Sequence, residues 1–126
     1  MIVTDNISLI LYVTGAITMA TFLQYFLPSF FLKATIGQET EGPAGRFYAQ
    51  GWGLAVGVLG LMLVYAGAHE EGREAIVMAG LLGKAGFIAL ILMNWSRHPF
   101  VRGHMGALIL DTICVVLYGL YLTQTL

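Results

Sequence analysis

The sequence predicts an all-α integral membrane protein, an up-down-up-down bundle of four transmembrane helices. The 126 residues are 58% hydrophobic and only 10% charged, whereas soluble domains carry about 25% charged residues. A chain this small has too little interior to hide so much apolar surface from water. Helices are favoured over strands because strict two-residue alternation is missing, and because open sheet edges in lipid would leave backbone groups unpaired.

The first predicted helix spans residues 7–27 and ends before Pro28. Crossing the hydrocarbon core takes about 20 apolar residues, and this run is long enough. A secretory signal peptide would begin with basic residues and contain a shorter apolar run. The first six residues hold Asp5 and no base. We therefore expect this helix to be retained.

Three further apolar runs predict helices at residues 47–68, 75–95 and 105–122, within a single membrane domain covering residues 1–126. A charged turn at residues 69–74 and a basic turn at residues 96–104 connect the last three helices. Such short links favour antiparallel neighbours. The longest loop is expected at residues 28–46, with an interfacial aromatic segment at its start and an exposed polar turn at Gly37 to Gly45.

The distribution of basic residues predicts the orientation. The first and third loops hold Lys33, Arg46, Arg97 and Arg102, while the second loop and the termini hold Arg73 alone. Cytoplasmic loops of membrane proteins carry the excess of Lys and Arg. We therefore expect both termini on the non-cytoplasmic side.

Two helices carry glycines at helical spacing. Close helix packing in lipid depends on small residues that let backbones approach. Such a groove serves either a dimer or partner seam or the packing of the bundle itself, and packing within the bundle is the favoured interpretation. The predicted packing glycines are Gly53, Gly57 and Gly60 in the second helix, continued by Gly67, and Gly80 and Gly83 in the third, continued by Gly86.

Polar residues recur on one face of the first and fourth helices. These faces are expected to meet inside the bundle, where hydroxyl and carboxyl groups can find partners. They comprise Thr14, Thr18, Thr21, Gln24 and Tyr25 in the first helix, and Ala107, Asp111, Cys114, Tyr118 and Tyr121 in the fourth.

Two ionisable residues, Lys84 and Asp111, lie deep within the third and fourth helices. A charge at the bilayer centre costs about 2.5–3.5 kcal/mol on insertion scales, so such residues usually face the interior and pair. Their similar depth predicts a Lys84–Asp111 ion pair. A structural pin is the favoured role for this pair, and a proton relay or ligand-binding pair is the alternative.

A second group of polar residues lies near the predicted cytoplasmic rim. Gln24, Arg46, Gln50 and His104 could line a cavity that opens inward, together with the ion pair. For Arg46 the favoured alternative is a snorkelling base at lipid phosphate. Trp52 is expected to anchor its helix at the interface.

No catalytic or cofactor motif is present in the sequence. Phosphate-binding loops, dinucleotide fingerprints and nucleophile elbows are absent. His98, His104 and Asp111 match no recognised metal-ligand spacing. We therefore expect no catalytic residue, metal site or cofactor. A net charge of −1 gives no electrostatic basis for nucleic-acid binding.

Three stretches carry a resemblance to a known group. Residues 46–53 (RFYAQGWG), the lysine within residues 83–85 (GKA) and residues 111–118 (DTICVVLY) together resemble small bacterial four-helix membrane proteins. In size and architecture the chain is similar to the DoxX-like group. The resemblance implies a four-helix bundle in the bacterial inner (plasma) membrane, and it implies no particular activity.

These features leave three functional hypotheses. The favoured one is a non-enzymatic accessory or scaffold subunit of a larger respiratory, photosynthetic or oxygenase complex, with the lipid bilayer and other subunits or further copies of the chain as partners. The first alternative is a small ligand- or lipid-binding or transport bundle that uses the Lys84–Asp111 pair. The second is a membrane enzyme acting on a lipid or quinone-like substrate.

Overall fold

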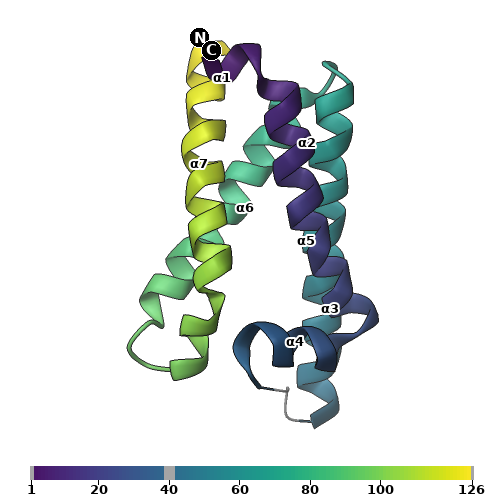
Figure 1. The fold of residues 1–126 in the computed structure, drawn as a ribbon, viewed down its shortest axis with the longest axis vertical. Helices are drawn as coiled ribbons and strands as arrows, with labels where there is room; N and C mark the ends of the chain where they lie inside the picture. Colours follow the sequence, from purple (N-terminus) through teal and green to yellow (C-terminus); the bar gives the residue numbers. More distant parts are fainter. Residues whose placement is uncertain (1, 39–41, 126) are drawn as a thin grey trace.

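The computed structural model describes residues 2–38 and 42–125, and every regular element in these ranges is helical. Figure 1 shows the arrangement. In chain order the elements are α1 (Ile2–Asp5), α2 (Ile7–Thr18), η1 (Met19–Thr21), α3 (Phe22–Phe26), α4 (Pro28–Ile36), α5 (Gly42–Ala68), α6 (Arg73–Met93), η2 (Pro99–His104) and α7 (Met105–Thr125).

Four helical segments are long and apolar enough to cross a membrane, which confirms the all-helical prediction. The first runs through α2, η1 and α3, and the fourth joins η2 to α7. Their bounds are Ile7–Phe26, Gly42–Ala68, Arg73–Met93 and Pro99–Gln124.

The prediction of a long loop at residues 28–46 is wrong, because most of the described residues in this range are helical. Pro28 begins α4, where its fixed φ suits the first helical turn and its missing N–H leaves no bond unmade. The helix ends at Gly37, whose φ of 72° is the left-handed conformation typical of a glycine C-cap. Helix α5 then begins at Gly42, five residues before the predicted start. Residues 39–41 of the predicted turn lie outside the described residues.

The helices associate as two pairs. The first span, α2 to α3, packs along α5, and α6 packs along α7. At one end of the molecule α1 contacts α7, so the start and the end of the chain lie side by side (Figure 1). The two pairs separate toward the opposite end, where α4 and η2 lie. The buried apolar core includes Leu11, Leu63, Ala66, Val77 and Tyr118.

The glycine groove of α5 packs against the first span, within the bundle. A Cβ on Gly60 would lie 2.6 Å from the Met19 backbone nitrogen, and one on Gly57 would lie 2.6 Å from the Phe22 ring. Gly15 completes the seam from the other side, because its Cβ would lie 2.8 Å from the Gly60 carbonyl oxygen. A Cβ on Gly53 would likewise lie 2.8 Å from the Thr21 carbonyl oxygen. Backbone contact of this kind is available only to glycine.

The glycines of α6 make looser contacts. A Cβ on Gly80 would lie 3.2 Å from the Leu63 side chain, and one on Gly83 would lie 3.7 Å from the Leu59 side chain. A Cβ on Gly86 would meet nothing within 4 Å among the described residues. The predicted third-helix seam is therefore tight only at Gly80.

Arg73 ties the α5–α6 turn to the first span. Its Nε donates to the Ala66 carbonyl at 2.6 Å, and its NH2 group donates to the Gly67 carbonyl at 3.2 Å and the Ser8 hydroxyl at 3.4 Å. Carbonyls in the last turn of a helix have no partner within that helix. A cation placed there also opposes the negative end of the helix dipole.

We predict that Gly60→Ala destabilises the protein, because the new methyl group would overlap the backbone of η1. Overpacking of this kind costs about 1–3 kcal/mol. Gly51→Ala on the same helix is the control, since a Cβ there meets nothing within 4 Å. Unfolding in lipid or mild detergent measures both. Equal stability of the two variants would contradict the packing account.

Candidate functional site

A buried polar centre joins three of the four spans. Lys84 of α6 places its Nζ 2.8 Å from Asp111 Oδ1 on α7 and 3.0 Å from Thr18 Oγ1 on α2. Relative exposures are 5% for Lys84, 7% for Asp111 and 4% for Thr18. The structure therefore brings together the Lys84–Asp111 pair that the sequence predicts, and it adds Thr18 as a third member.

The hydroxyl groups around this centre have defined directions. Thr18 Oγ1 donates to the Thr14 carbonyl at 2.7 Å, so it must accept the hydrogen bond from Lys84. Thr14 Oγ1 donates to the Ile10 carbonyl at 2.7 Å, so the Tyr118 hydroxyl 2.6 Å away donates to it. The polar stripes of the first and fourth helices thus meet through these groups.

Two hydrogen-bonding positions of the ion pair remain unused. A lysine ammonium group has three N–H donors, and two of those on Lys84 are engaged. Asp111 Oδ1 accepts from Lys84, while Oδ2 takes part in none of the hydrogen bonds among the described residues. One N–H donor of Lys84 and the Oδ2 acceptor of Asp111 therefore have no partner among the described residues.

Lys84 and Asp111 both line a cavity of about 570 Å³ between the two helix pairs. Small-molecule sites in proteins typically measure about 300–1,000 Å³. Lys84, Asp111 and Thr18 contribute to its wall, and the remainder is mostly apolar. Trp52 and Phe87 form part of its wall and contact each other, with ring centroids 5.4 Å apart. Trp52, which the sequence predicts to be an interfacial anchor, therefore also lines the cavity.

Helix α4 contributes Phe31 and Thr35 to the cavity wall, at the end of the molecule opposite the chain ends. This helix is held against η2 by a close backbone contact. A Cβ on Gly103 would lie 2.7 Å from Ile36 Cα and 2.9 Å from the Thr35 carbonyl oxygen. The sequence signals for α4, Pro28 and Gly37, indicate a helix, but they do not indicate that it lines a cavity.

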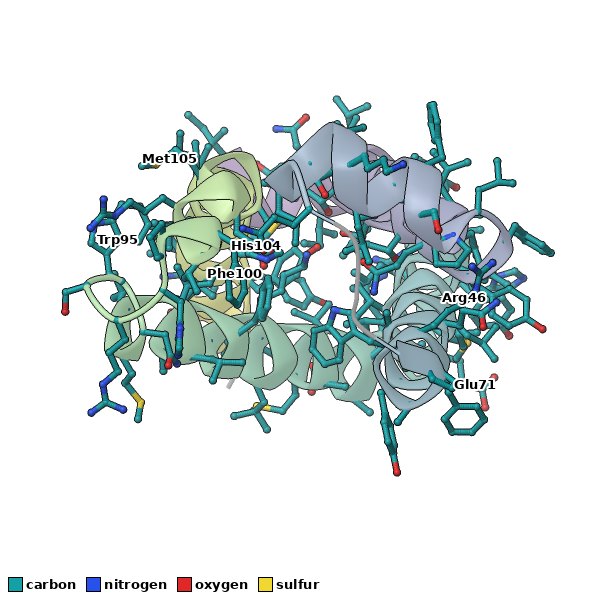
Figure 2. All side chains as sticks on the ribbon, turned by 90° about the horizontal axis from the view of Figure 1, so that it is seen from below. Arg46, Glu71, Trp95, Phe100, His104 and Met105 are labelled. Carbon is teal, nitrogen blue, oxygen red and sulfur yellow. The ribbon has the colours of Figure 1, made fainter. Side chains whose placement is uncertain are left out.

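The predicted rim group does not line this cavity. Gln24 donates to the Ala49 carbonyl at 2.6 Å, and Gln50 donates to the Tyr25 carbonyl at 3.1 Å, so both cross-link the first span to α5. Arg46 is exposed. His104 packs edge-on against a phenylalanine ring and lines a separate cavity of about 270 Å³. Figure 2 places Arg46 and His104 on opposite sides of the molecule.

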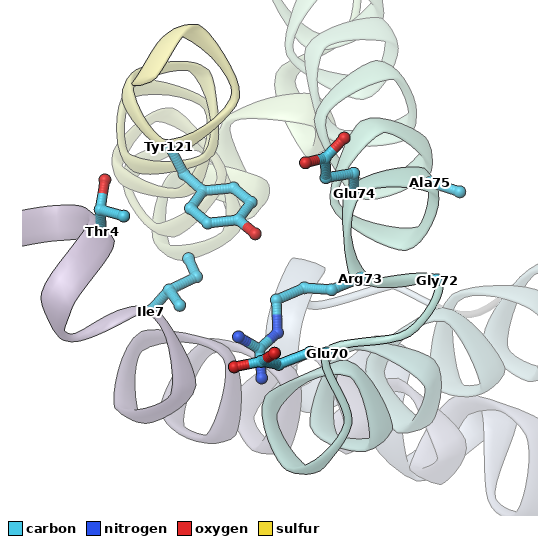
Figure 3. A pocket seen from close by; sticks show the side chains of 8 residues that line it. All are labelled: Thr4, Ile7, Glu70, Gly72, Arg73, Glu74, Ala75 and Tyr121. Atoms are coloured by element: carbon cyan, nitrogen blue, oxygen red, sulfur yellow. The ribbon is translucent and has the colours of Figure 1, made fainter. Parts of the chain in front are cut away.

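A third cavity, of about 690 Å³, lies at the end where the chain begins and ends (Figure 3). Glu70, Arg73, Glu74 and Tyr121 line it together with residues of α1 and α2. Both glutamates are exposed, and the Arg73 guanidinium is already engaged at the end of α5. The buried Thr4 hydroxyl in its wall has no hydrogen-bond partner among the described residues, but the cavity has no buried ion pair like the one in the central cavity.

Comparison with protein-family models, curated proteins and solved structures finds no match for this chain. The resemblance to DoxX-like proteins stays a prediction. The functional argument therefore depends on the geometry of the central cavity.

We predict that Lys84→Met destabilises the protein by about 3–5 kcal/mol, because it leaves the Asp111 carboxylate buried without a partner. The double variant Lys84→Met with Asp111→Leu should be more stable than the Lys84→Met single variant, since no buried charge remains. Arg97→Met, which removes an exposed cation from the turn after α6, is the control. Unfolding in bilayers measures these three variants and the Asp111→Leu single variant. A double variant with the summed losses of both single changes would contradict the pairing.

Proposed function

We propose that this chain is a small intramembrane binding protein that holds one amphipathic molecule of the bilayer in its central cavity. The apolar body of the ligand lies among the helices, and its polar end binds at Lys84 and Asp111. The observation that carries the proposal is a buried ion pair with unused hydrogen-bonding positions on the wall of a mostly apolar cavity.

The position of the pair favours binding over a purely structural role. A structural pin is most stabilising when every donor and acceptor is satisfied within the protein, because an incompletely satisfied buried network costs free energy. Thr18 completes only part of the pair's hydrogen bonding. A ligand of the cavity would supply the partners that the protein leaves out.

Native mass spectrometry of protein released from its own membrane tests the proposal. The unaltered protein should retain a bound small amphiphile. Ala107→Phe should lose it, because residue 107 lines the cavity and the new ring would fill it. Ala89→Phe is the matched control, since Ala89 is exposed on α6 and lines none of the three cavities described above. Equal retention in both variants, or no retained molecule at all, would contradict the proposal.

A second candidate function is an accessory subunit of a larger membrane complex. The observation that favours it is the exposed face of α6. Only 22% of the residues in the apolar part of this span are buried, and a Cβ added to Gly86 would meet nothing within 4 Å among the described residues. Small residues exposed on a helix in lipid permit close packing with another helix. Co-migration of the ligand-free protein with a large assembly in mild detergent would support this candidate over the first.

We further propose an up-down-up-down arrangement in the bacterial inner membrane, with both termini on the non-cytoplasmic side. The contact between α1 and α7 supports a common side for the two ends. With Cys114→Ala removing the one native thiol, Glu71→Cys should react with an impermeant maleimide in intact cells. Arg97→Cys should react only after permeabilisation. The reverse labelling pattern would contradict this orientation.

A further inference from the structure

We infer that the central cavity selects a single-chain lipid whose head group is uncharged and carries hydroxyl groups. The inference rests on the proposed function, and it specifies the class of ligand. It follows from the charge, the hydrogen-bonding inventory and the size of the cavity.

The charge of the cavity wall excludes strongly charged head groups. Among the described residues that line it, Lys84 and Asp111 are the ionisable acid and base, and their Nζ and Oδ1 atoms are 2.8 Å apart. An anionic head that bound Lys84 would lie beside the Asp111 carboxylate, and a cationic head that bound Asp111 would lie beside the ammonium group. Displacing either partner would leave a buried charge unpaired, which is strongly destabilising. A neutral head avoids both penalties.

The unused positions of the ion pair match a hydroxyl group. Lys84 has one N–H donor left, and Asp111 Oδ2 is an available acceptor. A hydroxyl group both accepts and donates. Its oxygen can therefore accept from the ammonium group while its hydrogen is donated to the carboxylate. A carbonyl group offers no hydrogen, so it could satisfy only the lysine.

Two threonines of the cavity wall can accept hydrogen bonds from the ligand. Thr21 Oγ1 donates to the Thr18 carbonyl at 2.8 Å, and Thr35 Oγ1 donates to the Phe31 carbonyl at 2.8 Å. Both threonines line the cavity, and each hydroxyl hydrogen is already used. Each oxygen therefore keeps lone pairs that can accept a further hydrogen bond. A head with more than one hydroxyl group, such as glycerol, could donate to a threonine and to Asp111 together.

The apolar part of the cavity suits one hydrocarbon chain. Ile17, Val56, Leu59 and Leu110 line it together with the Trp52 and Phe87 rings. A cavity of about 570 Å³ accommodates one small single-chain amphiphile, whereas a phospholipid with two full chains would extend out of it. A monoacylglycerol or a long-chain alcohol fits both the apolar lining and the polar positions.

Tryptophan quenching by brominated lipids tests this selectivity. The chain has two tryptophans, so Trp95→Phe leaves Trp52, which lines the cavity and is 46% exposed, as the reporter. The probes share one dibromostearyl chain and differ in the head, which is glycerol, sulfate or trimethylammonium. The glycerol probe should quench Trp52 at about tenfold lower concentration than either charged probe, which corresponds to about 1.4 kcal/mol. Ala107→Phe on the same background fills the cavity and keeps Trp52 in place, so it measures quenching of Trp52 by the surrounding lipid.

Two substitutions sharpen the test. Asp111→Asn gives the cavity a net positive charge, so the preference should shift to the sulfate probe. Thr21→Val keeps the shape and removes one acceptor, and it should weaken glycerol-probe binding about two- to tenfold, the range expected for one hydrogen bond. The threonine variant keeps the test decisive if the asparagine variant does not fold.

The outcomes separate the two proposals. Preference of the unaltered cavity for sulfate or trimethylammonium, or equal binding of all three heads, would overturn the selectivity while leaving the binding function standing. Quenching of Trp52 that with every probe is no stronger than in the Ala107→Phe variant would overturn the binding function itself.

Discussion

One ammonium group links the two halves of this bundle. Lys84 donates to Asp111 within the α6–α7 pair and to Thr18 across the gap to the α2–α5 pair. Hydrophobic association contributes little between helices in lipid, so close packing and polar contacts decide how they associate. Each pair has its own packing contacts, and the Lys84–Thr18 bond joins one pair to the other, together with the Tyr118–Thr14 hydrogen bond.

The cavity exists because packing is uneven along the bundle. On the first span Gly15 approaches the α5 backbone closely, and nearer the chain ends Leu11, Leu63 and Val77 fill the interior. Farther along, the two pairs diverge, and α4 and η2 occupy the end of the opening. Lys84 and Asp111 lie where close packing gives way to this space. Their burial and their access to a ligand therefore have the same structural cause.

Much of this architecture could be predicted from the sequence. Apolar length identifies the four spans, and the depth of Lys84 and Asp111 indicates their pairing. The sequence places Thr18 on the inward polar face, but its bond to Lys84 and the residues that line the cavity could not be predicted, because both depend on how far each helix rotates about its axis. Gln24 and Gln50 show this limit. Their position near one rim predicted a shared cavity, whereas in the structure each side-chain amide donates to a backbone carbonyl between α3 and α5. Helix α4 was predicted as a loop because its apolar run is too short to span a membrane.

The central claim is that the free N–H of Lys84 binds the polar end of a bilayer molecule. Solid-state NMR of the protein in native lipid, with ¹⁵N-lysine and ¹³C-aspartate labels, tests it most directly. The Lys84 Nζ signal should show short-range transfer both to the Asp111 carboxyl carbon and to protons of a bound lipid head. A Lys84 signal that reaches Asp111 and otherwise only water or protein protons would contradict the account.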